Sequence, residues 1–467
     1  MELKRSVYKK ILNWRRSQNK KPLIVEGLRQ VGKSFLCEKL GMEEYENYVL
    51  YDFRHDKSLN DIFINKKEKK LSVDSIIENS IVHFPNKRFV PNKTLLIFDE
   101  INDCALARES LKIFAKDNRY DVIATGSLLG ISDLKAKNIP AGYDSYIEVK
   151  PLDFIEFLLA CGIKEETIEL VYNYVEKNEE LSESYINILH SYFIRYILVG
   201  GMPEVVKKYI ETQNINEVRD EQQSLLKDYM HDFGTRYNEK GERYIDATLL
   251  IRISRAFDSI PDQLAKENKK FKYSVIKDGG RSSEFSDALE WLKKIGLIVK
   301  ANNLRVIESP LKGNSITEEF KVYLSDIGLL MAKYPITIVE QVLNDDLGAY
   351  KGAIYEAICA DILYKSNYDL YYFADSIKHL ENDFLIETTN GIDVFEVKAN
   401  NGKMASAKML YENRAQYKIH KIYKLIKKGY GKGDYFESFP HFLLPFFLNN
   451  IKENDKKKLV LNELPKI

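Results

Sequence analysis

The chain has 467 residues, which is long for a single hydrophobic core, so two to four domains are expected. Its 45% hydrophobic and 30% charged residues exclude an intrinsically disordered protein. With 70 Lys and Arg against 69 Asp and Glu, the formal net charge is only +1. This balance excludes a global positive field that would draw the protein onto nucleic acid, so any such binding needs a local patch.

Membrane insertion and secretion are not indicated. No run reaches the roughly 18 apolar residues of a membrane helix, the nearest being Phe439 to Leu448 with Pro445 inside it. The first residues, Met1 to Arg5, are not followed by an apolar segment, so no secretion signal is predicted. The four cysteines and seven histidines are dispersed, without metal-binding spacing or a disulfide framework. A cytoplasmic protein that does not use a membrane is the simplest expectation.

The strongest functional signal is the eight-residue stretch Gly27 to Ser34. It lies between an apolar run, Leu23 to Val25, and a helical one, Phe35 to Leu40. Two glycines in it allow a tight turn whose amides face an anion at the start of a helix. This Walker A pattern predicts an ATP-binding P-loop in which Lys33 reaches the β- and γ-phosphates and Ser34 holds Mg²⁺. The predicted nucleotide-binding residues are Gly27, Leu28, Arg29, Gln30, Val31, Gly32, Lys33, Ser34 and Phe35.

A second apolar run, from Thr94 to Phe98, ends in two carboxylates. Because parallel strands deliver their carboxyl ends to one edge of a sheet, these side chains are expected near the P-loop. We predict that Asp99 is a second Mg²⁺ ligand and that Glu100, with Lys33, is catalytic, orienting or deprotonating the attacking water. The alternative is a core strand followed by a solvated acidic turn.

A third apolar run, from Tyr120 to Ala124, ends in Thr125, Gly126 and Ser127. Thr125 or Ser127 is predicted to sense the γ-phosphate from this strand end. Alternatively, Ser127 caps a helix that continues through Leu128 and Leu129.

The alternation of strands and helices up to about residue 150, including a strand from Tyr48 to Phe53, predicts an α/β domain with a parallel sheet and helices on both faces. A helix is expected to start at Pro151, and helical periodicity continues to about residue 245, interrupted by a turn from Gly200 to Pro203. Two arginines of this part, Arg195 and Arg236, are candidates for a basic residue at the γ-phosphate, in cis or from a neighbouring subunit, although neither lies in a strong motif.

The stretch from Ala247 to Asn303 has the pattern of a winged helix. A helix is predicted from Ser286 to Lys294, capped by Ser282 and Ser283 and followed by a turn at Gly296 and a strand from Leu297. Such modules often bind DNA. Its few basic residues are offset by acidic ones, which favours packing between domains over DNA contact. The residues concerned are Arg281, Lys293 and Lys294 against Glu284, Asp287 and Glu290.

The last segment carries a second acidic set. Glu356 lies in a predicted helix, Asp383 in a strand, and Glu396 and Lys398 two residues apart on the next strand, hence on one face. Carboxylates beside a lysine can hold a divalent metal that positions water for attack on a phosphodiester, so Asp383 and Glu396 are metal-ligand candidates. The alternative for Glu396 and Lys398 is an exposed ladder of opposite charges.

As a whole, the chain resembles prokaryotic AAA-type ATPases with a C-terminal domain of unknown function called DUF4143. The resemblance rests on the P-loop, Leu95 to Glu100, Thr125 to Ser127, and Gly200 to Glu204, in that order. It implies an ATPase domain over residues 1–200, a helical and winged-helix region over 201–340, and a restriction-endonuclease-like domain, of the PD-(D/E)xK kind, over 341–467. It also implies that Asp383, Glu396 and Lys398 match that motif and that Glu356 matches its helix acid, whereas Asn382 departs from the family's Glu-Val-Asp pattern.

We expect one of three functions. The leading one is a Mg²⁺-dependent ATPase, as a single chain or a homo-oligomer, whose nucleotide state controls a C-terminal domain that contacts nucleic acid. The second is a nucleotide-gated DNA-binding regulator that cuts nothing. The third is a metal-dependent nuclease coupled to an ATPase.

Overall fold

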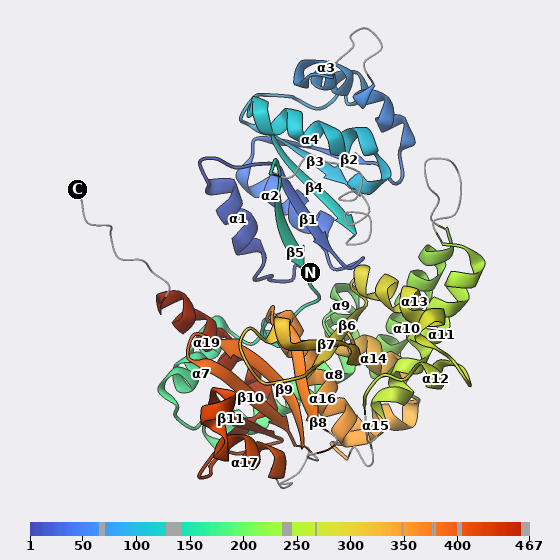
Figure 1. The fold of residues 1–467 in the computed structure, drawn as a ribbon. Helices are drawn as coiled ribbons and strands as arrows, with labels where there is room; N and C mark the ends of the chain where they lie inside the picture. The colour runs from blue at the N-terminus through green and yellow to red at the C-terminus, as the bar shows by residue number, and fades with distance from the viewer. Residues whose placement is uncertain are drawn as a thin grey trace, which may run out of the picture. The chain divides into compact units, whose positions relative to one another are not determined.

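The computed structural model describes residues 1–64, 71–127, 142–235, 245–266, 269–346, 350–375, 377, 380–398 and 404–458. The chain separates into two compact units. The main segment of the N-terminal unit is Leu3–Lys150, and the main segments of the C-terminal unit are Pro151–Lys293 and Leu297–Ile467. Figure 1 shows the N-terminal unit in blue to cyan and the C-terminal unit in green to red. The domain limits at residues 200 and 340 stay predictions.

The N-terminal unit is built on a five-stranded sheet of order β2-β3-β4-β1-β5, in which every pairing is parallel. This confirms the predicted α/β fold with a parallel sheet. Its elements are α1 (Tyr8–Arg16), β1 (Leu23–Gly27), α2 (Lys33–Glu44), β2 (Asn47–Asp52), η1 (Lys57–Phe63), α3 (Val73–His83), β3 (Thr94–Asp99), η2 (Ile101–Asp103), α4 (Ala105–Asp117), β4 (Asp121–Ser127) and β5 (Ser145–Val149).

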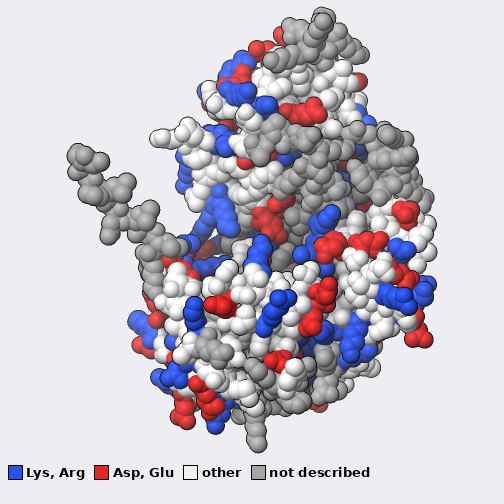
Figure 2. Space-filling view, viewed as in Figure 1, with Lys and Arg blue, Asp and Glu red and all other residues white. Residues whose placement is uncertain are grey.

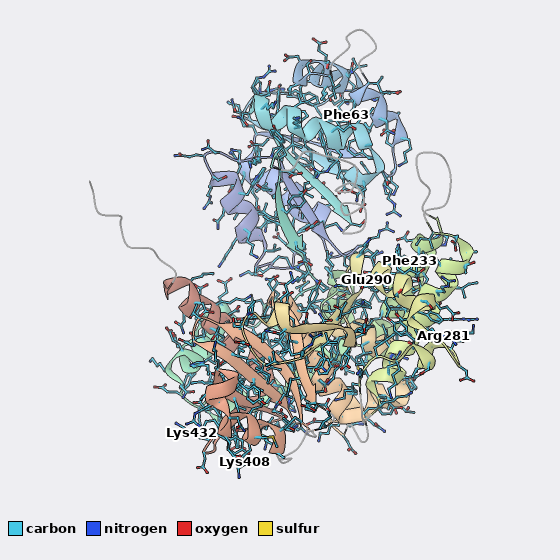
Figure 3. The ribbon with its side chains drawn as sticks, in the orientation of Figure 1. Phe63, Phe233, Arg281, Glu290, Lys408 and Lys432 are labelled. Atoms are coloured by element: carbon cyan, nitrogen blue, oxygen red, sulfur yellow. The ribbon has the colours of Figure 1, made fainter. Side chains whose placement is uncertain are left out.

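Both faces of this sheet are covered, because its central strands are apolar at successive positions. One face packs against η1, α3 and α4, where Phe98 of β3 contacts Tyr51 and Phe63, whose ring centroids lie 5.0 and 5.5 Å away. Phe63 is labelled in Figure 3. The other face contacts α2, which begins directly at the P-loop lysine. The sheet therefore fixes the start of α2 beside the carboxyl ends of β1, β3 and β4.

The C-terminal unit opens with helices, as predicted. The first of them begins at Phe154 rather than at Pro151, because Asp153 and Glu156 form a capping box that sets its start. The helical elements of the unit are α6 (Phe154–Ala160), α7 (Glu165–Lys177), α8 (Glu183–Val199), α9 (Pro203–Thr212), α10 (Ile215–Thr235), α11 (Ala247–Leu264), α12 (Tyr273–Ile276), α13 (Ser282–Lys294), η3 (Leu311–Asn314), α14 (Ile327–Lys333), α15 (Ile336–Leu343), α16 (Lys351–Lys365), α17 (Ala405–Glu412), α18 (Arg414–Tyr417), η5 (His441–Leu443) and α19 (Leu444–Lys458).

An eight-stranded mixed sheet of order β12-β13-β11-β10-β9-β8-β6-β7 forms the rest of the unit. The antiparallel hairpin β6–β7 adds to its edge, since β6 pairs in parallel with β8. The strands are β6 (Ile298–Leu304), β7 (Ser315–Leu324), β8 (Leu370–Asp375), β9 (Leu380–Thr388), β10 (Gly391–Val397), β11 (Ile419–Ile426), β12 (Gly431–Lys432) and β13 (Glu437–Pro440).

The helices α11, α12 and α13 precede this hairpin, which is the order that the winged-helix prediction requires. Helix α13 begins at Ser282, four residues before the predicted start, directly after a turn at which Gly279 has a φ of 69° and Gly280 donates to the Lys277 carbonyl. The winged helix itself stays a prediction.

The turn from Gly200 to Pro203 joins α8 and α9 to the rest of the unit. An added Cβ at Gly201 would lie 2.0 Å from the Leu152 carbonyl oxygen, so only glycine fits there. The amide of Gly201 donates to Asp326, 2.7 Å away, and Asp326 pairs with the buried Lys365 at 2.8 Å. This motif therefore has a structural role, linking the turn to α14 and α16. Within the described residues, no helix combines the length and the apolarity that crossing a membrane would require.

Candidate functional site

The predicted P-loop runs from the end of β1 into α2. Gly27 has no room for a side chain, since an added Cβ would lie 2.1 Å from the Val149 carbonyl oxygen of the adjacent strand β5. Gly32 has a φ of 89° and is the N-cap of α2, a left-handed conformation that favours glycine. The two glycines thus allow the sharp return from strand to helix, and the N-terminus of α2 faces the loop.

Lys33 is almost fully buried, with 5% of its surface exposed. Its ammonium donates to the carbonyl oxygens of Leu28 at 2.9 Å and of Gly27 at 3.3 Å. These contacts hold the charge against the concave side of the loop. The Val31 carbonyl accepts a hydrogen bond of 2.9 Å from Arg5.

Three oxygen-bearing side chains from different elements converge at the end of β3. The Ser34 hydroxyl donates to Oδ1 of Asp99 at 2.6 Å, and the Thr125 hydroxyl donates to the same oxygen. The Glu100 amide donates to the Thr125 hydroxyl at 3.1 Å. Strand β4 lies between β1 and β3 in the sheet, which places Thr125 between the loop and Asp99. Hydroxyl and carboxylate oxygens are the ligands that Mg²⁺ prefers, so the donor set fits this ion.

A cavity of about 270 Å³ opens beside these residues. Eight of the predicted residues line it, and so do three that the sequence interpretation missed. The predicted ones are Arg29, Gln30, Gly32, Lys33, Ser34, Phe35, Asp99 and Glu100, and the additional ones are Asp52, Arg54 and His55. The remaining predicted residues do not line the cavity directly. Gly27, Leu28 and Val31 belong to the P-loop, and Thr125 donates a hydrogen bond to the lining residue Asp99. Ser127 is buried and pairs in register with Gly27.

Glu100 has an unusual backbone conformation for a residue with a side chain. Its φ and ψ are both 50°, in the left-handed region, and η2 begins directly after it. Such conformations cost about 1–3 kcal/mol and cluster at functional sites, where the surrounding structure maintains them. Glu100 lines the cavity next to Asp99, as a residue that acts on water beside a metal must.

The residues missed by the sequence interpretation lie at the end of β2 and directly after it. Asp52 pairs in register with Asp99 of β3, and its Oδ2 lies 2.7 Å from Nδ1 of His55. Its Oδ1 accepts the amides of Arg54 and His55 at 3.2 and 3.1 Å. Burial raises the pKa of Asp52, but these hydrogen bonds outweigh it, so the pKa is lowered overall. The signal was available in part, because Asp52 lies near the end of the strand predicted from Tyr48 to Phe53, where the rule that singled out Asp99 also applies.

Of the two arginines proposed for the γ-phosphate, Arg195 is not among the described residues that line this cavity. Arg195 donates from Nη1 to the Ser191 carbonyl at 2.9 Å and lines another cavity, of about 590 Å³, with Tyr192 and Tyr209. Arg236 lies outside the described residues. The helix proposed after Ser127 also falls there, at Leu128 and Leu129.

The second acidic set is brought together in the C-terminal unit. Asp383 of β9 and Glu396 of β10 lie on paired antiparallel strands, and Oδ2 of Asp383 accepts the Val397 amide at 2.7 Å. Glu396 pairs with Lys398 at 2.8 Å, and Glu356 of α16 accepts from Lys321 at 3.0 Å. The Glu396–Lys398 pair is not an exposed ladder, because Glu396 is only 2% exposed. Among the described residues, no group of three or more His, Cys, Asp and Glu side chains is arranged to hold a metal ion.

Residues 19–158 match the family profile described as an AAA domain, and residues 351–435 match a domain of unknown function, DUF4143. The chain carries an AAA domain followed by a DUF4143 domain. Between them, residues 190–338 match a further domain of unknown function, DUF8612. The predicted architecture is thereby confirmed, and the restriction-endonuclease-like character of the last domain stays a prediction.

The chain is also similar, at low identity, to solved structures. The Orc1 protein of Aeropyrum pernix in complex with DNA is 11% identical over 74% of this chain and 93% of that chain, with a TM-score of 0.29. The RuvB Holliday junction branch migration motor of Thermotoga maritima is 14% identical over 64% and 89%, also with a TM-score of 0.29. Drosophila ORC bound to DNA is 10% identical over 72% and 93%, with a TM-score of 0.25. At TM-scores this low, the similarity supports no conclusion about function or partners. No curated protein matches the chain.

Proposed function

We propose that this protein is a cytoplasmic, Mg²⁺-dependent ATPase whose nucleotide state acts on the DUF4143 domain. The observation that carries the proposal is the convergence of Ser34 and Thr125 on Asp99 beside the P-loop cavity. A loop that only bound an anion would not need a carboxylate beside it, at the end of β3. A carboxylate and a hydroxyl at hydrogen-bond distance are what a nucleotide-bound Mg²⁺ requires.

Each residue has a proposed role. The amides of residues 28–34 and the N-terminus of α2 bind the phosphates, and Lys33 exchanges its contacts with Gly27 and Leu28 for the β- and γ-phosphates. Ser34 and Asp99 would hold Mg²⁺, which would supply positive charge to the phosphates in the transition state. Glu100 orients and deprotonates the attacking water, and Thr125 fixes the Asp99 carboxylate.

We further propose that the positive charge at the γ-phosphate comes from this chain. Arg29 and Arg54 line the cavity, whereas Arg195 lines a different one. A guanidinium within the same chain would allow hydrolysis by a single copy. Turnover per molecule would then be independent of protein concentration. A rise in specific activity with concentration would instead indicate a homo-oligomer in which a neighbouring copy completes the site.

Separating binding from hydrolysis tests the assignment. We expect Glu100→Gln to keep ATP affinity within about twofold and to lower kcat by about 10²-fold or more, since only the transition state needs the carboxylate. We expect Asp99→Asn also to raise the Mg²⁺ concentration that half-maximal turnover requires. The matched control is Glu78→Gln, an exposed residue of α3 in the same unit. Wild-type turnover in Glu100→Gln would remove Glu100 from this role.

We propose nucleic acid as the partner class of the C-terminal unit. On the face of the molecule that Figure 2 shows, the described side chains of this unit do not form a continuous basic surface. Three acidic residues of α13 form ion pairs with nearby Lys and Arg side chains, as Lys277–Glu284, Arg252–Asp287 and Lys300–Glu290. On the face in Figure 2, basic and acidic side chains are interspersed, and Figure 3 labels Arg281 and Glu290 in this region.

ATP turnover measured alone and then with duplex DNA, single-stranded DNA and RNA tests this partner class. Low salt is required, because phosphate contacts are strongest there. Stimulation by one of these nucleic acids would identify it as the partner. No stimulation and no binding at low salt would contradict the proposal.

A further inference from the structure

A buried group of charges lies where the sequence predicted metal ligands, and it joins three acids to three lysines. We call it the charge centre. Its carboxylates are Glu356, Asp383 and Glu396, and its ammonium groups are Lys269, Lys321 and Lys398. All six residues belong to the C-terminal unit. The three carboxylates therefore face three ammonium groups without any bound ion, and Glu381, whose side chain is 51% exposed, adds a fourth carboxylate against Lys321.

Two of the three lysines come from outside the segment that matches DUF4143. Lys321 is on β7, in the edge hairpin, and Lys269 precedes α12, whereas the carboxylates lie within residues 351–435. Lys321 is 1% exposed and contacts Glu356 at 3.0 Å and Glu381 at 3.1 Å. A lysine buried this deeply has lost its hydration, so its charge must be met by carboxylates.

The carboxylate oxygens that a metal would need already accept hydrogen bonds. Oε1 of Glu356 accepts from Lys321 and from the Tyr323 hydroxyl, and Oε2 accepts from Lys269. In Glu396, Oε1 accepts from the Asn382 amide and Oε2 pairs with Lys398. In Asp383, Oδ2 accepts the Val397 amide. Five of the six oxygens are thus occupied by donors of the chain itself.

We propose that the charge centre is a cation site that the protein fills with its own lysine. The Lys321 ammonium holds the position that a divalent metal would take, and it thereby fastens the β6–β7 hairpin to α16 and to β9. In this arrangement the acids have a structural role, since they bind the lysines that connect the hairpin to the rest of the unit. The centre therefore does not support metal-dependent cleavage of a phosphodiester. The proposal is independent of the ATPase function.

The acid–base properties of the centre agree with this arrangement. Burial alone would raise the pKa of Glu356, but Lys321 and Lys269 lower it to about 2. Burial and the neighbouring Asp383 raise the pKa of Glu396 to about 7, and burial and Glu356 raise that of Asp383. Lys321 and Lys269 therefore stabilise the ionised form of Glu356. Asp383 and Glu396, on β9 and β10, keep raised pKa values although Lys398 lies near both, because a single positive charge offsets them less than a divalent ion would.

Binding of Mn²⁺ to the nucleotide-free full-length protein tests the proposal. Bound Mn²⁺ is measured by the loss of the free-ion electron paramagnetic resonance signal. Asp383→Asn is compared with the wild type so that only ions at this centre are counted. We expect no difference between these two proteins. In Lys321→Met, which vacates the position, we expect one additional Mn²⁺ per chain, lost again in Lys321→Met with Asp383→Asn.

Thermal unfolding gives a second readout. Lys321→Met leaves buried carboxylates without their partner, so we expect its Tm to fall by about 5–10 °C. The control Lys300→Met removes a lysine of the adjacent strand β6 whose partner, Glu290, is exposed, and we expect its Tm to stay within about 2 °C of the wild type.

Three results would overturn the proposal. One is Mn²⁺ bound to the wild type but not to Asp383→Asn. Another is a Lys321→Met protein with the wild-type Tm, and the third is a folded Lys321→Met protein that gains no Mn²⁺. Should Lys321→Met not fold, the comparison of the wild type with Asp383→Asn still decides whether the centre takes a metal.

Discussion

Replacing Arg5 by alanine should weaken ATP binding, although Arg5 is not part of the P-loop motif. Its Nη1 donates to the carbonyl of Val31 in the loop at 2.9 Å, and its Nη2 donates to the carbonyl of Lys150. Lys150 is the last residue of the N-terminal unit's main segment. One guanidinium therefore holds the loop and the exit of the chain from this unit in a fixed geometry.

The size of the effect is set by these two bonds. A hydrogen bond from a charged group contributes about 1.5–3 kcal/mol when buried. Arg5 itself is only half-buried, so we expect Arg5→Ala to destabilise the N-terminal unit by about 2–3 kcal/mol. If about 1.4 kcal/mol of that falls on the loop conformation, the binding-competent fraction drops and the Kd for ATP rises roughly tenfold.

Isothermal titration calorimetry with a non-hydrolysable ATP analogue measures the affinity, and urea unfolding measures stability. Arg5→Lys, which can keep one of the two bonds, should lie between the wild type and Arg5→Ala. The control is Arg16→Ala on α1, whose exposed side chain lies 3.9 Å from Glu44 and should have almost no effect. Wild-type affinity and stability in Arg5→Ala would refute the reasoning.

Three further predictions concern other parts of the chain. Gly201→Ala should destabilise the C-terminal unit by about 3 kcal/mol or more in urea unfolding, because its Cβ would meet the Leu152 carbonyl; a loss below about 1 kcal/mol would show that the turn can shift. Arg54→Ala should lower kcat at least tenfold in a phosphate-release assay with little change in the Kd for ATP, and unchanged kcat would exclude Arg54 from the γ-phosphate. Lys321 helps lower the pKa of Glu356 to about 2, so the stability that Glu356 contributes is complete above about pH 4.5 and is lost as the pH falls towards 2. The difference in unfolding free energy between the wild type and Glu356→Gln, on the order of 3 kcal/mol in urea unfolding, should therefore shrink over that pH window. A difference that is constant from about pH 6 to 3 would contradict this.

Local patterns were enough to predict the N-terminal fold and most of the candidate site. Gly27 and Gly32 are required by backbone geometry within the P-loop itself, and Asp99 and Thr125 end apolar strands, so neighbouring residues carried the signal. The order of strands was not predictable in the same way. It is the position of β4 between β1 and β3 that brings Thr125 to Asp99.

Long-range contacts explain what the sequence could not show. Arg5 meets Lys150 across 145 positions, and Lys321 meets Glu356 across 35, with no local pattern marking either pair. The resemblance matched Glu356 to the helix acid of a restriction-endonuclease-like motif, and a local motif contains no information on the distant Lys321. At Phe154, by contrast, a local signal was present, since the capping box of Asp153 and Glu156 could have been recognised from the sequence.

Phosphate release from ATP by the purified protein tests the central claim most directly. It should be measured with Mg²⁺, with excess EDTA, and with Lys33→Ala, whose ammonium in the wild type contacts Leu28 at 2.9 Å. We predict release that needs Mg²⁺ and falls at least about 10²-fold in Lys33→Ala. Equal release by Lys33→Ala, or no ATP binding and no release by the wild type with Mg²⁺, would contradict it.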